Sequence, residues 1–163
     1  MKNILFVCTG NTCRSVMAAA LFRKMAAEAP EFLVSSAGIS AMEGFPPSQH
    51  TIEVMKDEGL DVSGHRSRRL SRQMLEEADS VFVMEKMHKD LIVSFIPFAK
   101  EKISLLTEFM NSAAGGVACM DVPDPIGMTP EFYKNVLSVI RQCVQNIADH
   151  LKGPEGSEPA KEG

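Results

Sequence analysis

Residues 4–15 read Ile-Leu-Phe-Val-Cys-Thr-Gly-Asn-Thr-Cys-Arg-Ser, and this stretch decides the fold. The apolar run at 4–7 follows a polar start and has the length of a strand that is buried on both faces, as in a parallel sheet. Residues 17–25 instead place their apolar side chains at helical spacing. Residues 8–14 therefore form a loop that leaves a strand and opens a helix, and Ser15 is the predicted N-cap of that helix.

The rest of the chain alternates predicted strands with predicted helices. Strands are expected at residues 32–37, 81–84 and 102–106. Helices are expected at residues 48–59, 88–93 and 129–151, the last of which opens with a Thr-Pro-Glu sequence typical of a helix start. This alternation predicts a three-layer α/β fold, in which helices cover both faces of a four-stranded parallel sheet. Ligands bind such sheets beyond the carboxyl ends of the strands, where the loop at 8–14 lies.

Composition fits one cytoplasmic domain. The chain has 163 residues, of which 45% are hydrophobic and 23% charged, so we expect a single domain over residues 1–152. Residues 153–163 lack core side chains and are expected to be a disordered tail. A net charge of −4 and the absence of Trp argue against nucleic-acid binding. The run at 4–7 is too short for a signal peptide or a membrane span, and four cysteines are too few for a disulfide framework.

The loop at 8–14 has the features of an anion-binding nest. A loop that enters a helix presents several backbone N–H groups to one point, and the helix dipole adds to their attraction. Gly10 allows backbone angles that other residues resist, and Asn11 is among the next most tolerant residues. Arg14 is placed to hold two phosphate oxygens with its planar guanidinium. A phosphate group is the expected ligand.

Cys8 lies at the base of this nest, in a positive field that favours the thiolate form of cysteine. The Ser15 hydroxyl is placed to hydrogen-bond the sulfur and stabilise it further. A thiolate inside a phosphate cradle is a nucleophile directed at phosphorus. An inert buried thiol is the ordinary alternative, but the nearby Gly10, Asn11 and Arg14 favour the nucleophile.

Two other interpretations of the loop fail. A nucleotide-binding Walker loop requires a lysine directly before its Ser or Thr, and Ser15 follows an arginine. A zinc site at Cys8 and Cys13 would need two further ligands at sensible spacing, which the sequence does not supply. We therefore expect an enzyme that uses neither a metal nor an organic cofactor.

The Cys-x5-Arg-Ser pattern that begins at Cys8 resembles the low-molecular-weight protein-tyrosine-phosphatase family. The resemblance covers residue 2 to about 151 and includes, in order, Ser35-Ser36-Ala37-Gly38, His65 with the Arg66–Arg69 stretch, Val83-Met84-Glu85 and Asp124-Pro125. It implies a protein phosphatase that forms a phosphocysteine on Cys8 while Arg14 holds the phosphate. It also implies that the following residues bind the substrate or hold the loop: Thr9, Gly10, Asn11, Thr12, Cys13, Ser15 and Ser36.

The resemblance makes Asp124 the general acid. Asp124 would protonate the leaving group and then act as base on the water that hydrolyses the phosphocysteine, and a poor leaving group requires such a proton donor. From the residues alone, Asp124 between Pro123 and Pro125 is equally an ordinary turn residue. With the family pattern, Asp124 is preferred over Asp121.

Cys13 matches a family position as well, where a second thiol can form a reversible disulfide with Cys8. A buried small hydrophobic residue is an equally good interpretation of Cys13. Cys119 and Cys143 are expected to have no chemical role, and His65 matches the family pattern without a clear catalytic role. The remaining histidines are expected at the surface: His50, His88 and His150.

The sequence departs from the family pattern in three places. Val16 replaces a usual proline, which should alter only the start of the helix. Thr12 replaces a larger aliphatic residue, and Ile126-Gly127 replaces the aromatic pair that follows Asp-Pro in tyrosine-specific members. A hydroxyl suits a polar guanidinium better than a phenyl ring, and the loop resembles that of the bacterial protein arginine phosphatases of this family. Phosphotyrosine and phosphoarginine both stay open, with a preference for phosphoarginine.

Two rival functions are weaker. An arsenate reductase on the same fold needs two further relay thiols, and the sequence has no cysteine between Cys13 and Cys119. A non-catalytic phosphoprotein-binding module would lack the nucleophile or the acid, and this chain has both. The expected partners are phosphorylated proteins rather than nucleic acid or membrane, and the expected state is a monomer or weak dimer.

Overall fold

A computed structural model describes residues 1–110 and 120–153 of the protein. Four parallel strands form one sheet in the order β2-β1-β3-β4. Their bounds are Lys2–Cys8 for β1, Phe32–Gly38 for β2, Ser80–Val83 for β3 and Ile103–Leu105 for β4. The predicted four-stranded parallel sheet is confirmed, although β4 is shorter at both ends than the sequence pattern predicts.

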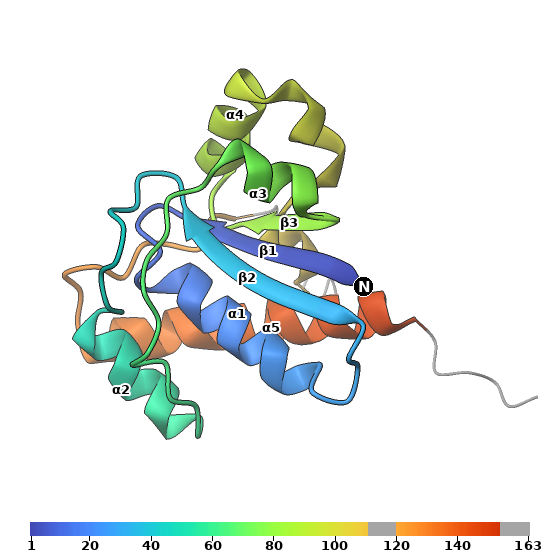
Figure 1. Ribbon diagram of the computed structural model, residues 1–163. Helices are drawn as coiled ribbons and strands as arrows, with labels where there is room; N and C mark the ends of the chain where they lie inside the picture. Colours follow the sequence, from blue (N-terminus) through green and yellow to red (C-terminus); the bar gives the residue numbers. More distant parts are fainter. Residues whose placement is uncertain (111–119, 154–163) are drawn as a thin grey trace, which may run out of the picture.

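Helices cover both faces of this sheet (Figure 1). The helices α1 and α5 pack under one face with α2 beside α5, whereas α3 and α4 lie over the other face. The predicted three-layer α/β architecture is therefore confirmed. The bounds are α1 Arg14–Met25, α2 Gln49–Asp57, α3 Arg72–Glu77, α4 Lys86–Phe95, α5 Pro130–Lys152 and the 3-10 helices η1 Pro97–Lys102 and η2 Leu106–Phe109.

The central strand β1 faces two separate cores. Ile4 and Phe6 point into the core shared with α1 and α5, and Leu5 and Val7 point into the core beneath α3 and α4. All four side chains are buried. Because a strand's side chains alternate between faces, an uninterrupted apolar run is what a strand buried on both faces requires.

The helix starts test the capping predictions. Ser48 accepts a hydrogen bond from the Thr51 N–H at the start of α2, and Thr129 caps α5 in the same way. The N-cap predicted at Ser15 is wrong, because α1 begins at Arg14 and Ser15 is buried inside its first turn. The Ser15 hydroxyl is occupied by the loop that precedes the helix.

The short helix α3 is absent from the sequence-based prediction. It has six residues, and Leu75 is its buried residue. A single buried side chain gives no repeating apolar pattern from which a helix could be predicted. The start of α3 is indicated only by the N-cap Ser71, whose side chain accepts a hydrogen bond from the Met74 N–H.

Within the described ranges, no helix is both long and apolar enough to cross a bilayer. The predicted tail beyond residue 153 and Cys119 lie outside those ranges.

Gly38 brings the end of β2 against the loop that follows β1. A Cβ atom at Gly38 would lie 2.6 Å from the Thr9 carbonyl oxygen and 2.8 Å from the Asn11 nitrogen. The chain beyond this glycine continues alongside the loop, since the Ile39 N–H donates to the Cys8 carbonyl and the Ser40 N–H donates to that of Thr9. Glycine is thus required here by close backbone approach.

Candidate active site

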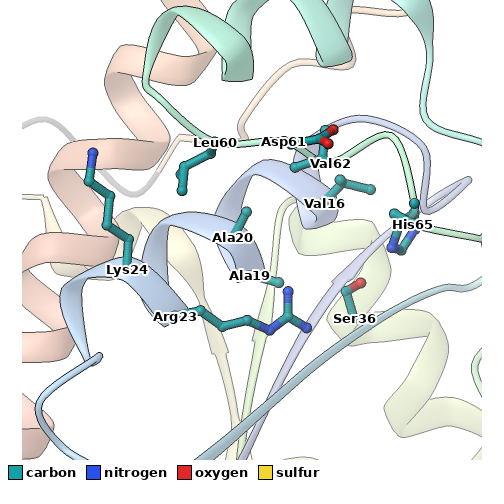
Figure 2. Close-up of a pocket in the computed structure, with 11 residues that line it drawn as sticks. Val16, Ala19, Ala20, Arg23, Lys24, Ser36, Leu60, Asp61, Val62 and His65 are labelled. Carbon is teal, nitrogen blue, oxygen red and sulfur yellow. The ribbon is translucent and has the colours of Figure 1, made fainter.

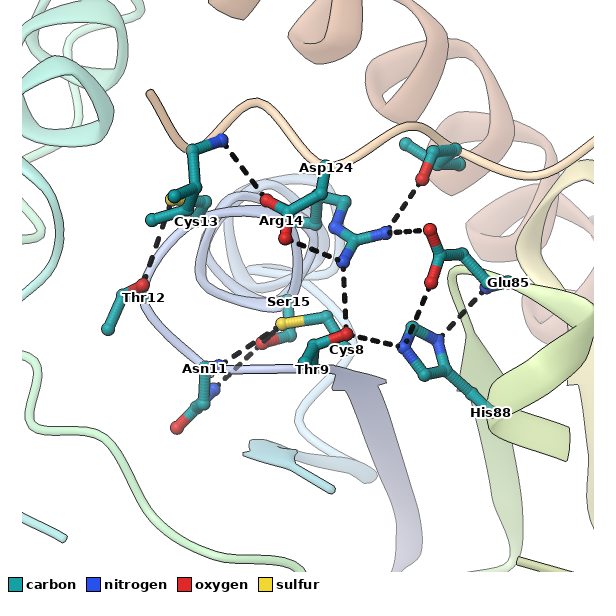
Figure 3. Close-up of polar contacts among 12 residues, drawn as sticks. Cys8, Thr9, Asn11, Thr12, Cys13, Arg14, Ser15, Glu85, His88 and Asp124 are labelled. Carbon is teal, nitrogen blue, oxygen red and sulfur yellow. Dashed lines mark hydrogen bonds and ion pairs between the residues drawn. The ribbon is translucent and has the colours of Figure 1, made fainter. Parts of the chain in front are cut away.

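The loop from Cys8 to Arg14 joins the carboxyl end of β1 to the first turn of α1 (Figure 3). Asn11 adopts a left-handed backbone with φ 55° and is the one described non-glycine residue with a positive φ. Gly10 has no positive φ. The conformational freedom that the sequence analysis assigned first to Gly10 is therefore needed at Asn11, a residue type that tolerates this region.

The buried Asn11 side chain hydrogen-bonds to three other parts of the site. Its Nδ2 donates to Ser15 Oγ at 2.8 Å and to Ser36 Oγ at 3.0 Å, and its Oδ1 accepts from the Arg68 N–H at 2.9 Å. His65 Nε2 donates to the Asn11 carbonyl at 3.0 Å. These bonds, contributed by α1, β2 and the segment before α3, hold the strained residue in place.

Cys8 is buried, and two donors reach its sulfur. Ser15 Oγ lies 2.9 Å from Cys8 Sγ, and the Asn11 N–H donates to the same sulfur over 3.3 Å. Because Ser15 Oγ accepts the Asn11 amide, its own hydroxyl proton is free to point at Cys8. The predicted hydrogen bond between Ser15 and Cys8 is confirmed, and such donors favour a thiolate over a thiol.

Arg14 is 1% exposed, and its guanidinium lies beside the loop (Figure 3). Nη1 donates to the Val122 carbonyl at 2.7 Å and pairs with Glu85 Oε1 at 3.1 Å. Nη2 lies 3.4 Å from Thr9 Oγ1 and 3.6 Å from Asp124 Oδ2. A buried cation needs such partners, and they fix the plane of the guanidinium at the edge of the loop.

His88, expected at the surface, is instead 1% exposed and belongs to this site. The Glu85 N–H donates to His88 Nδ1 at 3.1 Å, so the proton of the neutral ring is on Nε2. Nε2 faces Thr9 Oγ1 at 2.9 Å and Glu85 Oε2 at 3.3 Å. Burial, and then the charge of Arg14, lower the pKa of His88 to about 4. His88 is therefore neutral at physiological pH.

The chain of contacts from His88 to Arg14 was missed in the sequence analysis. Glu85 accepts from the His88 N–H while His88 accepts from the Glu85 N–H, which is a capping box at the start of α4. The sequence does contain the pattern of this capping box, as Glu-x-x-His at residues 85–88, directly after the third apolar run. Glutamate and histidine in place of the usual Ser/Thr and Glu/Gln made this box hard to read.

Asp121 and Asp124 both follow Met120, and the structure shows that they make different contacts. Asp121 Oδ1 accepts from the Lys86 N–H at 2.7 Å and so anchors its loop to the start of α4. Asp124 has a side chain 44% exposed, with Oδ1 accepting from the Ile126 N–H at 3.1 Å and Oδ2 facing Arg14. Asp124 is thus the aspartate whose carboxylate lies next to the guanidinium and remains open to solvent.

Cys13 is buried on the α1 side of the loop. Its sulfur lies 3.3 Å from Ser48 Oγ, 3.6 Å from Tyr133 Oη and 3.7 Å from Thr12 Oγ1. Burial is the main cause that raises the pKa of Tyr133 to about 12, so its hydroxyl remains a donor. Cys13 is a free thiol, and its predicted disulfide with Cys8 stays a prediction.

Cys143 lies in the buried face of α5, where burial raises its pKa to about 12. A thiol with so high a pKa supplies almost no thiolate at neutral pH. Cys143 is therefore unsuited to the thiol relay that an arsenate reductase would need.

Comparison with known proteins identifies one family over most of the chain. The family model of the low molecular weight phosphotyrosine protein phosphatases matches residues 3–155. A protein-arginine-phosphatase of Geobacillus stearothermophilus is 38% identical over 149 residues, which are 91% of this chain and 95% of the relative. The low molecular weight protein-tyrosine-phosphatase Ptp of Acinetobacter johnsonii is 32% identical over 150 residues, which are 92% of this chain and 98% of the relative.

A solved structure adds to these relatives. A cysteine-to-serine mutant of YwlE arginine phosphatase with a phosphorylated active-site serine superimposes with a TM-score of 0.84 and 32% sequence identity. The match covers 92% of this chain and 95% of that one. The resemblance first inferred from the Cys-x5-Arg-Ser loop is confirmed over nearly the whole domain. The chain therefore belongs to the low-molecular-weight phosphotyrosine protein phosphatase family, whose members are cysteine-dependent hydrolases.

Proposed function

We propose that this member of the family is a protein arginine phosphatase in which Cys8 is the nucleophile, Arg14 holds the phosphate and Asp124 is the general acid. The observation that carries the proposal is the buried Cys8 sulfur, which has two hydrogen-bond donors in a loop next to a buried guanidinium. A sulfur so placed is stabilised as a thiolate within an anion-binding loop.

The first chemical step transfers the phosphoryl group to sulfur. The Cys8 thiolate forms a bond to phosphorus as the phosphorus–nitrogen or phosphorus–oxygen bond of the substrate breaks. Arg14 and the backbone N–H groups of the loop hold the equatorial oxygens, on which negative charge is carried in the transition state. Asp124 gives its proton to the departing nitrogen or oxygen.

The second step releases phosphate. Asp124, now a carboxylate, takes a proton from a water molecule that attacks the phosphocysteine, and the sulfur–phosphorus bond breaks to restore the thiolate. The 44% exposure of Asp124 is compatible with both roles, because the residue reaches the solvent as well as the guanidinium of Arg14. The Asp124–Ile126 hydrogen bond supports the carboxylate in one orientation.

The preference for phosphoarginine is supported by Thr12 at the rim of the loop. Thr12 is half-buried, and its hydroxyl has a weak 3.7 Å contact with the Cys13 sulfur, which leaves it able to accept from a guanidinium. Ile126 and Met128, which follow Asp124, are exposed aliphatic residues and offer no aromatic slot. The Geobacillus relative is named a protein-arginine-phosphatase, which also supports phosphoarginine as the substrate. Phosphotyrosine is the second candidate, favoured by the name of the family model.

A comparison of two phosphopeptides tests the preference. Peptides of one sequence carrying phosphoarginine or phosphotyrosine should be hydrolysed with the higher kcat/KM on phosphoarginine. Thr12→Val removes only the hydroxyl and should lower the phosphoarginine rate about tenfold, the value of one hydrogen bond to a charged group, while leaving the phosphotyrosine rate nearly unchanged. Thr12→Ile should shift the ratio further toward phosphotyrosine. A wild-type preference for phosphotyrosine that neither substitution changes would refute the phosphoarginine assignment.

The same proposal covers the partners, the compartment and the oligomeric state of the enzyme. Its partners are phosphorylated proteins, and the relatives named above act on proteins. Cys8, Cys13 and Cys143 are free thiols, which suits a reducing compartment such as the cytoplasm. Sedimentation equilibrium of the pure protein tests the expected monomer or weak dimer.

A further inference from the structure

A cavity lies beside the catalytic loop, between α1 and the segment at residues 60–65 (Figure 2). Its volume is about 540 Å³, large enough for a small organic molecule. One wall is apolar and is formed by Val16, Ala19 and Ala20 of α1 together with Leu60 and Val62. No step of the proposed reaction uses this cavity.

Arg23 lines the other side of the cavity, and Arg66 and Arg68 lie outside the lining but close enough to act on the lining residue His65. Arg23 extends its guanidinium from α1 toward Ser36 (Figure 2), and its Nη2 donates to the Val34 carbonyl at 3.0 Å. Arg66 and Arg68 also donate to backbone carbonyls. In the part of the chain that the structure describes, no carboxylate lies within salt-bridge distance of these three arginines.

Arg68 is close enough to act on Arg23, and all three guanidinium groups act on His65. Partial burial, and then the charge of Arg68, lower the pKa of Arg23. Burial, and then the charges of Arg23, Arg68 and Arg66, lower the pKa of His65, which also lines the cavity. Such mutual repulsion shows a local excess of positive charge, which an anion would relieve.

The other charged groups at the cavity do not cancel this excess. Asp61 is its one lining carboxylate, and it accepts a hydrogen bond from the Ser63 N–H at 2.9 Å. Lys24 Nζ donates to the Glu58 carbonyl at 3.0 Å, and its side chain points away from the Arg23 guanidinium (Figure 2). One carboxylate therefore faces two lining cations, with two further arginines close by.

The basic side of the cavity is joined to the catalytic loop through Asn11. Ser36 accepts from the Asn11 amide, His65 donates to the Asn11 carbonyl, and the Arg68 N–H donates to Asn11 Oδ1. Asn11 in turn donates its backbone N–H to the Cys8 sulfur. A ligand that moves Ser36 or His65 will therefore alter the left-handed residue that supports the nucleophile.

We propose that this cavity binds a small organic anion whose carboxylate, sulfonate or phosphate group pairs with Arg23 and whose apolar body packs against α1, and that binding alters turnover through Asn11. The two ends of the cavity match the two parts of such a ligand. The binding half of the proposal is independent of the enzyme's function, whereas the effect on turnover rests on the proposed phosphatase activity.

Binding is tested with naphthalene-1-sulfonate as the probe, while saturating vanadate occupies the catalytic loop. Backbone amide NMR signals of Ala19, Ala20 and Val62 should shift saturably. Arg23→Gln should weaken the affinity about tenfold, the loss of one charged hydrogen-bonding partner. Arg72→Gln is the matched control, because Arg72 is an exposed arginine of α3 paired with Glu76, and it should bind like wild type. The absence of saturable shifts, or equal affinity in Arg23→Gln, overturns the proposal.

The effect on turnover is measured separately, without vanadate. The probe should change kcat in the wild type and in Arg72→Gln but not in Arg23→Gln, which keeps its own basal turnover. Purely competitive inhibition of equal strength in all three proteins means that the probe binds the catalytic loop, and the coupling is then wrong. If no phosphopeptide is hydrolysed at all, the proposed function fails while the NMR titration still decides whether the cavity binds anions.

Discussion

The buried, neutral His88 makes a quantitative prediction about stability and pH. Its pKa is lowered to about 4 in the folded protein from the ordinary value of 6.5. The unfolded chain therefore binds a proton on this residue as the pH falls through 6.5, while the folded protein does not until about pH 4. Unfolding is favoured over this window. Between pH 7 and pH 5, His88 alone should lower the free energy of unfolding by about 2 kcal/mol.

Urea unfolding followed by far-ultraviolet circular dichroism measures this loss. His88→Gln does not titrate, and its side-chain amide can still donate to Thr9, so the variant should lose about 2 kcal/mol less than wild type between pH 7 and pH 5. His150→Gln, in which an exposed histidine is replaced, should keep the wild-type pH dependence. If His88→Gln loses as much stability as wild type on acidification, the buried neutral state of His88 is refuted.

Four further substitutions test the geometry of the site. Arg14→Lys should lower kcat/KM by about 100-fold or more, because a point charge cannot hold two phosphate oxygens at once; near-normal rates in a standard hydrolysis assay would contradict the clamp. Asp124→Asn should slow aryl phosphates with poor leaving groups far more than those with good ones, whereas Asp121→Asn should affect the series evenly; the reverse pattern would exchange the two roles. Gly38→Ala should destabilise the protein by about 1–3 kcal/mol in urea unfolding, because its Cβ meets the loop backbone; an unchanged midpoint would contradict this close packing.

The loop and the sheet could be predicted because their signals are local. When an apolar run is followed by polar residues and then by a helical period, the polar residues form a loop at the carboxyl end of a strand. This inference does not depend on the rest of the chain. Ser15 shows the limit of such reasoning. A serine at a helix start is usually a cap, so the sequence predicts both a cap and a hydrogen bond to Cys8 for Ser15. Only the structure shows that the bond to the sulfur forms and the cap does not.

Two of the features that were missed, the burial of His88 and the need for glycine at residue 38, depend on contacts distant in sequence. His88 is polar and lies among Lys86, Met87 and Lys89, a composition typical of an exposed helix. His88 is buried where it contacts Thr9, 79 positions earlier in the chain, just beyond the carboxyl end of β1. Gly38 was quoted as part of a motif, but the need for glycine appears only when the loop is packed against it.

The central claim is that the phosphoryl group passes through Cys8, and trapping that intermediate tests it most directly. Acid quenching of the enzyme during hydrolysis of a phosphoarginine or phosphotyrosine peptide, followed by mass spectrometry, should find one phosphoryl group on the peptide that contains Cys8. Asp124→Asn should accumulate more of it with a good leaving group, because the second step then lacks its base. Cys8→Ser should still bind vanadate but show no steady-state turnover. Sustained hydrolysis by Cys8→Ser, or a phosphoryl group found only on another residue, would contradict the mechanism.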